Sequence, residues 1–276
     1  MTRSRLVALC LAGAALAACG EDNGVGAAPP IAGVRFINAV ADTGAMDFRV
    51  VDIVGDAPQF LDNTYRTATS YQAVEAGDRH LRVFLTPSRT DTFYTPPVMW
   101  DTTFTFTEGV NYSVIMSGYA NPTRGVSLNM IITTDDATEP AAGQFGLRII
   151  NLGTALGSVD AYTRRGTAAA PGTAYATDVV FGGVAPYGVQ ATDTNAFRVL
   201  VAAAGTTTPA LADVAGPAGV AGTSTVNPIA GTNVERSVLT AILVPASVAG
   251  TGAGSFATPS VLFVTDRRPP LTVPAP

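Results

Sequence analysis

The chain has 276 residues, of which 47% are apolar and 13% charged, and its formal net charge is -5. This length allows one large domain or two of ordinary size with real hydrophobic cores, and the acidic balance argues against nucleic acid as a partner. There is no Lys and only one His, His80, which excludes a lysine nucleophile and a metal site built from several histidines. We therefore expect neither a cofactor nor a bound metal ion.

The N-terminal segment has the features of a bacterial export signal. Two arginines precede an apolar run over residues 6–18, which is shorter than a typical membrane-spanning helix of about 20 residues. The run ends in "LAAC", which resembles the lipobox of bacterial lipoproteins, where the Cys receives a lipid and the peptide before it is removed. This resemblance predicts a signal peptide at residues 1–18 and a lipid on Cys19. An ordinary secretory signal is the alternative, because "ALAAC" also offers small-residue cleavage patterns.

Residues 19–32 are rich in Gly, Ala and Pro and carry no apolar periodicity, which predicts a flexible tether. Together with a lipid on Cys19, such a tether would hold the rest of the chain at a membrane of the cell envelope. Gly20 follows the Cys where an Asp could stand, and this resembles the default for outer-membrane sorting in diderm bacteria. We expect a lipid-anchored protein of the outer membrane.

One phrase of the sequence occurs twice. Residues 35–47 read "RFINAVADTGAMD" and residues 148–160 read "RIINLGTALGSVD". Three further pairs of segments match in the same order. The identical residues at matching positions include Arg35 and Arg148, Asn38 and Asn151, Gly44 and Gly157, Asp47 and Asp160, and Tyr71 and Tyr187. A match of four segments in one order indicates a tandem duplication of a domain-sized unit.

The duplication sets the predicted domain boundaries. We expect a first domain at residues 33–137, a linker at 138–144 and a second domain at 145–268. A Pro-rich tail, residues 269–276, follows.

Each copy carries the pattern of a β protein. Short alternating runs such as "VRFINAV", "HLRVFL" and "YSVIMSG" are rich in strand-forming residues, and Gly-, Asp- and Asn-rich turns separate them. No helix-length amphipathic run follows the signal peptide. About seven short strands in each copy favour an immunoglobulin-like sandwich, although neither copy has the Cys pair of a true immunoglobulin domain. The predicted fold is all-β, with two tandem immunoglobulin-like antiparallel β-sandwiches after a cleaved lipoprotein signal peptide.

The repeated residues have structural interpretations. Val34, Phe36 and Ile149 are expected in the cores, and the paired glycines are expected to supply the backbone conformation of a tight turn. The paired asparagines are expected to satisfy backbone groups near a bend. For Asp47 and Asp160, two roles stay open: capping a turn, or pairing with the repeated Arg.

The motifs of the first copy resemble the bacterial domain-of-unknown-function 4397 (DUF4397) family, whose members carry a V-R-x-x-x-A…V-D start, a Y-x-x-V-x-A-G middle and a G-x-x-Y end. The matching residues are Val34, Arg35, Ala39, Asp47, Tyr71, Val74, Ala76, Gly77, Gly109 and Tyr112. The second copy departs from the pattern, with Leu152 and Thr192-Asp193 in place of the Ala and the Ala-Gly pair. The resemblance implies secreted or lipid-anchored β-sandwich domains, often in tandem, and no activity.

Two groups of residues are candidates for catalysis or metal binding. His80 is the only imidazole base for a hydrolase, and we expect an exposed His near a strand edge instead. The acidic residues Asp135, Asp136 and Glu139 could serve a glycosidase or bind calcium. We expect a solvated charge cluster beside the linker, and no catalytic residue is assigned.

The stretch from Tyr94 to Phe104, "YTPPVMWDTTF", is predicted as a Pro-bent loop. Its aromatic residues Tyr94, Trp100 and Phe104 are candidate ligand contacts, because aromatic rings stack on sugars and seat protein partners. The alternative is a loop that folds its aromatics over its own core. The second copy carries a Gly/Ala/Thr-rich stretch there instead, Thr206 to Pro228, which predicts a floppy surface excursion.

The sequence thus favours a lipid-anchored envelope protein that acts as a non-catalytic binding or structural module. Its expected partners are the membrane, through the lipid on Cys19, and an envelope protein or polysaccharide. Binding of a carbohydrate or envelope polymer through the Trp100 loop is the alternative, and a hydrolase is the weakest candidate.

Overall fold

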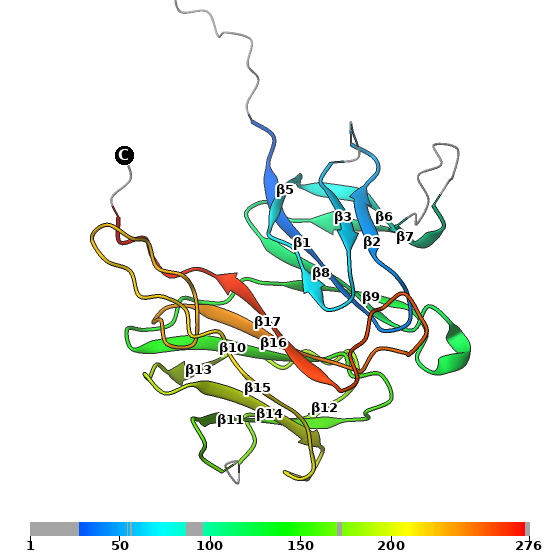
Figure 1. Cartoon of the computed structure of the whole chain (residues 1–276). Helices are drawn as coiled ribbons and strands as arrows, with labels where there is room; N and C mark the ends of the chain where they lie inside the picture. Colours follow the sequence, from blue (N-terminus) through cyan, green and yellow to red (C-terminus); the bar gives the residue numbers. More distant parts are fainter. Residues whose placement is uncertain (1–27, 54, 56, 87–95, 170–172, 274–276) are drawn as a thin grey trace, which may run out of the picture. The chain divides into compact units, whose positions relative to one another are not determined.

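The computed structural model describes residues 28–53, 55, 57–86, 96–169 and 173–273. The chain divides into two compact units, Met1–Pro30 and Ile31–Pro276, and only residues 28–30 of the first unit are described. The second unit is made of β-strands, with one short 3-10 helix, η3 (Pro122–Arg124), among its described residues (Figure 1).

Within the described ranges, nine strands form a first sandwich and eight form a second. The strands of the first sandwich are β1 (Ile31–Val40), β2 (Met46–Val50), β3 (Gln59–Asn63), β4 (Thr67–Ala68), β5 (Gln72–Glu75), β6 (Gly77–Leu85), β7 (Val98–Phe106), β8 (Asn111–Gly118) and β9 (Asn129–Thr134). The strands of the second are β10 (Gln144–Asn151), β11 (Val159–Arg165), β12 (Ala176–Val179), β13 (Gly188–Ala191), β14 (Phe197–Ala203), β15 (Ala210–Ala215), β16 (Val238–Val244) and β17 (Ser260–Arg267).

The two sandwiches have corresponding strand orders. In the first, a sheet β4-β1-β8-β9, with β5 also on β1, faces a sheet β3-β2-β6-β7. In the second, the sheet β13-β10-β16-β17 faces the sheet β12-β11-β14-β15. The sheets that contain β1 and β10 also pack against each other, through a separate apolar cluster that joins both sandwiches. The unit is therefore a stack of four sheets in which these two form the inner layers (Figure 1).

The predicted all-β fold of two sandwiches is confirmed, and two of its features differ from the prediction. β1 pairs with β8 in parallel, with Phe36 opposite Val114, and β10 pairs with β16 in parallel in the same way. The strand order also departs from the immunoglobulin arrangement, in which strands A, B, E and D form one sheet and C, F and G the other. Alternation along a strand identifies its two faces but not its neighbour, so the sequence could not reveal this pairing.

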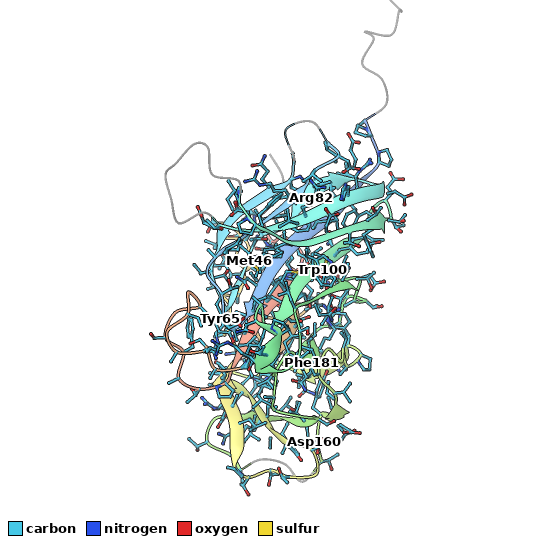
Figure 2. The ribbon with its side chains drawn as sticks, turned by 90° about the vertical axis from the view of Figure 1, so that its right-hand side faces the viewer. Met46, Tyr65, Arg82, Trp100, Asp160 and Phe181 are labelled. Carbon is cyan, nitrogen blue, oxygen red and sulfur yellow. The ribbon has the colours of Figure 1, made fainter. Side chains whose placement is uncertain are left out.

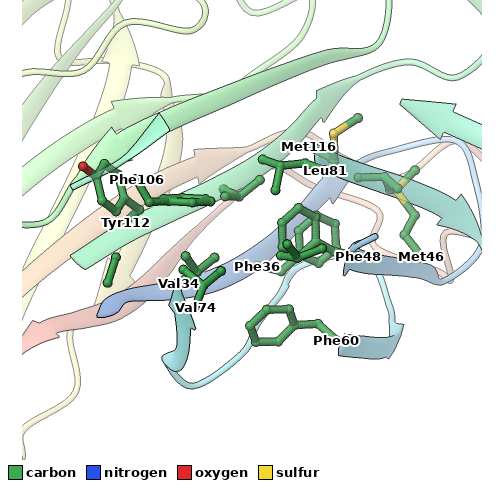
Figure 3. Packing of buried hydrophobic residues seen from close by; sticks show 14 of the residues in the cluster. Val34, Phe36, Met46, Phe48, Phe60, Val74, Leu81, Phe106, Tyr112 and Met116 are labelled. Carbon is green, nitrogen blue, oxygen red and sulfur yellow. The ribbon is translucent and has the colours of Figure 1, made fainter. Parts of the chain in front are cut away.

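The core of the first sandwich is built from the alternate residues of its strands. Val34 and Phe36 of β1 are fully buried in it, and the rings of Phe36 and Phe48 stack with centroids 5.3 Å apart (Figure 3). At its other end Phe106 and Tyr112 meet edge to face at 5.2 Å. In the second sandwich, Ile149 occupies the corresponding core. The predicted core positions Val34, Phe36 and Ile149 are thus confirmed.

The alternate face of β1 is buried as well, because the second sandwich covers it. Ile37 and Ala39 of β1 pack there with Ile150 of β10 and Ile242 of β16. A strand buried on both faces usually reads as a continuous apolar run, but β1 keeps an Arg, Arg35, on this covered face. That Arg belongs to the site described below.

The repeated Asn and Asp residues satisfy backbone groups. Asn38 donates to the Asn63 carbonyl at 2.8 Å and accepts from the Val40 N–H, and Asn151 does the same between Val179 and Gly153. The predicted role of the asparagines is confirmed.

Asp47 accepts from the N–H of Asp62 at 2.9 Å, and Asp160 accepts from the N–H groups of Asp178 and Gly205. Both aspartates therefore accept hydrogen bonds from the backbone of turns. This is the capping role, and not the pairing with the repeated Arg.

The two repeated glycines serve different purposes. Gly157 has a φ of +73°, as predicted for a tight turn. Gly44 lacks a positive φ, so that part of the prediction was wrong. Instead, the connection between β16 and β17 lies against it, and a Cβ on Gly252 of that connection would come within 2.8 Å of the Gly44 backbone. The connection is held to the first sandwich by Arg66, which donates to the Thr258 carbonyl at 2.6 Å.

Candidate functional site

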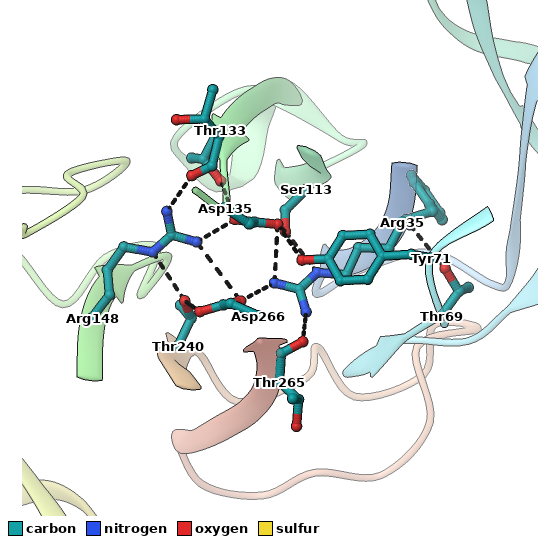
Figure 4. A network of polar contacts seen from close by, with 12 residues as sticks. Arg35, Thr69, Tyr71, Ser113, Thr133, Asp135, Arg148, Thr240, Thr265 and Asp266 are labelled. Atoms are coloured by element: carbon teal, nitrogen blue, oxygen red, sulfur yellow. Dashed lines mark hydrogen bonds and ion pairs between the residues drawn. The ribbon is translucent and has the colours of Figure 1, made fainter. Parts of the chain in front are cut away.

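The repeated Arg of each sandwich reaches across to the other sandwich (Figure 4). Arg35 of β1 donates through Nη2 to Asp266 Oδ1 of β17 and through Nη1 to the Thr265 carbonyl at 2.8 Å. Arg148 of β10 mirrors this, donating to Asp135 Oδ1 at 2.5 Å and to the Thr134 carbonyl at 2.8 Å. The two ion pairs therefore cross the junction in opposite directions.

Each Asp is also held by its own sandwich. Asp135 accepts from Ser113 at 2.5 Å and from the hydroxyl of Tyr71 at 2.6 Å.

Asp266 accepts from Thr240 at 2.5 Å and from the hydroxyl of Tyr187 at 2.9 Å. Ser113 and Thr240 in turn accept from the Nε atoms of Arg35 and Arg148. Every member of one half has its counterpart in the other, so the network has approximate two-fold symmetry.

The network is buried and balanced in charge. The side chains of Arg35 and Arg148 are 3% and 4% exposed, and those of Asp135 and Asp266 are fully covered. Burial by itself would lower the pKa of Arg35, but the carboxylates of Asp266 and Asp135 outweigh it and raise this pKa. Burial also raises the pKa values of Tyr71 and Tyr187. The two tyrosines therefore stay protonated and act as hydrogen-bond donors.

The tyrosine rings cover the guanidinium groups. The Arg35 guanidinium lies 4.8 Å from the ring centroid of Tyr71, and that of Arg148 lies 4.4 Å from Tyr187. These contacts use one face of each ring. The network thus forms a closed polar joint within the apolar interface of the two sandwiches.

A cleft opens beside this joint. Its volume is about 830 Å³, and its walls are residues 68–71 of the first sandwich, residues 262–268 along β17, and residues 228–230. Arg35 and Asn111 also belong to its lining. We call it the junction cleft. Its volume falls within the range of sites that bind small molecules or short segments of a chain.

The junction cleft owes one wall to a segment that only the second sandwich has. The connection from β15 to β16 covers residues 216–237, whereas the corresponding connection from β7 to β8 covers only residues 107–110. A second cavity, of about 540 Å³, lies beside residues 183–188 and is lined by the second sandwich alone. Of the two cavities, only the junction cleft is formed by both sandwiches.

The prediction of a floppy excursion at Thr206–Pro228 was wrong. Part of it is strand β15, which pairs with β14. Beyond β15, Val220 and Ile229 form a β-bridge, and Asn227 accepts from the backbone N–H of Thr272. A composition of small residues suggested flexibility, but tertiary pairing gives the segment a defined conformation.

The predicted aromatic ligand contacts lie elsewhere. Trp100 and Phe104 belong to strand β7 rather than to a loop, and both are half-buried and pack against the core of the first sandwich. Figure 2 marks the position of Trp100. This is the alternative in which the aromatics cover their own core. Tyr94 lies outside the described residues. The structure therefore does not join Trp100 and Phe104 to the junction cleft.

His80 and Asp135 have contrasting positions. His80 is on β6, and its Nε2 lies 2.5 Å from Oδ1 of the half-exposed Asp101. Its side chain is half-exposed, but β6 lies between β2 and β7, so the expected edge position was wrong. Asp135 was expected in a solvated cluster, and this was wrong, because its side chain is fully covered in the joint. The sequence did hold a signal for it: "TTD" ends the first copy where "VTD" ends the second.

Within the described residues, no group of three His, Cys, Asp or Glu side chains could hold a metal ion. In the same residues there is no helix with the length and hydropathy needed to cross a membrane. Cys19, the predicted lipidation site, lies outside the part of the chain that the structure describes.

Comparison with solved structures gave low similarity. CBMbc (family CBM26) from Eubacterium rectale Amy13K, in complex with maltoheptaose, shares 12% identity over 84% of this chain and 95% of that one, with a TM-score of 0.23. A chain described as a cell adhesion protein from Bacteroides eggerthii shares 10% identity over 88% and 97%, with a TM-score of 0.22. At such TM-scores neither similarity carries an argument. No curated protein matches the chain.

The family comparison is more specific. The model described as "Domain of unknown function (DUF4397)" matches residues 32–162, which cover the first sandwich and reach into β11. This agrees with the motifs around Arg35, Tyr71 and Tyr112, two of which also take part in the joint. Residues 32–162 of the chain are therefore similar to the DUF4397 family.

Proposed function

We propose that this protein is a non-catalytic binding or structural module of the cell envelope, anchored by a lipid on Cys19 in the outer membrane of a diderm bacterium. The lipobox-like "LAAC" and the tether after it support the anchor. The fold after the tether supplies the module.

The observation that carries the proposal is the joint between the sandwiches. Four buried charged side chains, Arg35, Arg148, Asp135 and Asp266, pair across it in two directions. If one sandwich slid or rotated on the other, these charges would be left unpaired in an apolar interface, at a cost of several kcal/mol. The two sandwiches therefore act as one rigid body, and the junction cleft keeps its shape.

A rigid body on a flexible tether suits recognition of an envelope protein or polysaccharide. Pre-formed surfaces bind without the entropic cost of ordering them. Carbohydrate binding through Trp100 is the second candidate from the sequence, but Trp100 is partly buried and packs against the core. The junction cleft is the stronger candidate surface.

The test is photo-crosslinking in cells, with the photoreactive amino acid placed at one position at a time. Ile229 at the junction cleft is 60% exposed, and Val98 on β7 and Val189 on β13 are 49% and 55% exposed matched controls. A photoreactive group is needed because the chain has no Lys for amine reagents.

We expect one envelope protein or polymer to be captured from Ile229, and capture to be lost with Cys19→Ala, which prevents lipidation. If no position captures an envelope component in the lipidated protein, the binding proposal fails. Capture that is unchanged with Cys19→Ala would remove the anchor from the proposal.

A further inference from the structure

The junction cleft follows the outer edge of strand β17. Seven consecutive residues, 262–268, line it. Because successive side chains of a strand point to opposite faces, a cleft that contacts all of them borders the edge of the strand rather than one face. β17 is the last strand of its sheet, with β16 on its other side. Its outer edge therefore has no strand partner, although one carbonyl in this stretch, that of Thr265, already accepts from Arg35.

A second wall of the cleft comes from the first sandwich. Ala68 ends β4 and residues 69–71 connect it to β5, and the hydroxyls of Thr69 and Ser70 are polar groups on that wall. This geometry fits an extended peptide that adds to a sheet edge.

The positive charge at one end of the cleft favours an acidic ligand. Arg267 and Arg268 line the end where β17 terminates. Arg267 shares Glu139 with Arg236, whereas Arg268 makes no ion pair with any described residue. An acidic side chain on the bound peptide would complement this end.

The apolar and aromatic groups argue against a sugar ligand. The Ile229 side chain, 60% exposed, provides an apolar contact at the cleft. The two aromatic residues of the lining are not open platforms: Tyr71 stacks on Arg35, and Phe263 packs against the core of the second sandwich. Sugar recognition by stacking needs an exposed ring face.

We propose that the junction cleft binds an extended acidic peptide segment of a partner protein, which adds as a strand to the outer edge of β17. This inference rests on the proposed binding function and names the partner's chemistry. Apolar side chains of the peptide contact Ile229, and an acidic side chain pairs with Arg268.

The experiment is selection of a random library of short linear peptides against the lipidated full chain in detergent, followed by affinity measurement of the selected peptides. Arg268→Glu and Ile229→Asp alter the cleft, and both side chains are exposed, so the fold should persist. Thr103→Glu and Val98→Asp, on the exposed positions of β7, are the matched controls. Thermal unfolding confirms that all four variants fold.

The expected result is a set of acidic peptides whose affinity falls about tenfold or more with each cleft variant and is unchanged with each control. N-methylation of alternate peptide nitrogens should cause a similar loss, because it removes backbone hydrogen bonds. The proposal is overturned if no peptide is selected, or if the cleft variants or N-methylation leave binding intact.

Polygalacturonate, a carboxylated polysaccharide, is tested in parallel. If it binds in an Arg268-dependent way and no peptide does, the cleft belongs to a polysaccharide and the peptide proposal is wrong. Capture of an envelope component in cells together with failure of the peptide selection would leave the binding function standing and remove only this inference.

Discussion

Arg35 and Asp266 are 231 residues apart in the sequence, yet they form a buried ion pair between the first and last main strands of the two sandwiches. The equivalent pair, Arg148 and Asp135, runs the other way across the same interface. The repeated Arg of the sequence therefore joins each copy to the other. This arrangement resembles the self-complementary interface of a two-fold dimer, here within one chain.

Removal of either Arg should be strongly destabilising. Arg35→Ala or Arg148→Ala leaves a covered carboxylate without its cationic partner, and we expect the free energy of unfolding to fall by about 3–5 kcal/mol. Urea unfolding measures this loss.

The matched control is Arg82→Ala, because Arg82 pairs with the half-exposed Asp101 on the surface of β6 and β7. A surface pair contributes little to stability. Equal losses for Arg35→Ala and Arg82→Ala would contradict the role of the joint.

The tyrosines of the joint predict a dependence of stability on alkaline pH. Because the folded pKa values of Tyr71 and Tyr187 are raised by burial, the unfolded chain loses phenolic protons above about pH 10 while the folded chain keeps them. Stability from this source is thus complete below about pH 10 and is lost as the pH rises.

Urea midpoints measured between about pH 8 and about pH 11 should fall more steeply for the wild type than for Tyr71→Phe/Tyr187→Phe. Tyr175, whose pKa burial raises to about 12, stays in both proteins and adds the same slope. Identical slopes for the two proteins would show that these hydroxyls are not buried donors.

The repeated asparagines should matter equally in both copies. Asn38 and Asn151 are fully buried and bind backbone groups at the end of β1 and β10. Substitution by Ala leaves those groups unsatisfied, and we expect each change to cost about 1–3 kcal/mol in thermal or urea unfolding. Asn121→Ala, at an exposed turn, is the control. A loss in only one copy would mean that the two positions are not equivalent.

Trp100 should contribute to stability more than to binding. Its ring packs on the core of the first sandwich, so Trp100→Ala is expected to lower the free energy of unfolding by about 2 kcal/mol through lost apolar burial. Glycan-array binding is the measurement that separates this role from carbohydrate recognition. Glycan binding abolished by Trp100→Ala in a folded protein would restore the alternative site.

The sequence predicted much of the fold from local patterns. Alternation in β1 placed Val34 and Phe36 in a core, and the spacing of matching residues paired Arg35 with Arg148. Both inferences depend on residues near one another in the chain or on identity between copies. The parallel pairing of β1 with β8 depends on long-range contacts that no local pattern records.

The candidate site was harder to predict for a related reason. Alternation places Arg35 on the face of its strand opposite Val34 and Phe36, but it does not show that a second sandwich covers that face. Asp135 was therefore assigned to solvent, although its match with Asp266 marked both as repeated. Trp100 was a candidate ligand contact because exposed aromatic rings often bind ligands. A single sequence does not distinguish an exposed ring from one that packs on the core of its own domain.

The most direct test of the rigid joint compares unfolding of the two sandwiches. Trp100, the only Trp, reports on the first sandwich, and a fluorophore on Val189→Cys of β13 reports on the second, in a background where Cys10 and Cys19 are both replaced by Ser. We predict coincident urea transitions for this protein, and separate transitions once Asp135→Asn and Asp266→Asn have removed both carboxylates. Separate transitions with the joint intact, or coincident transitions without it, would contradict the claim that the buried Arg–Asp pairs make the two sandwiches one body.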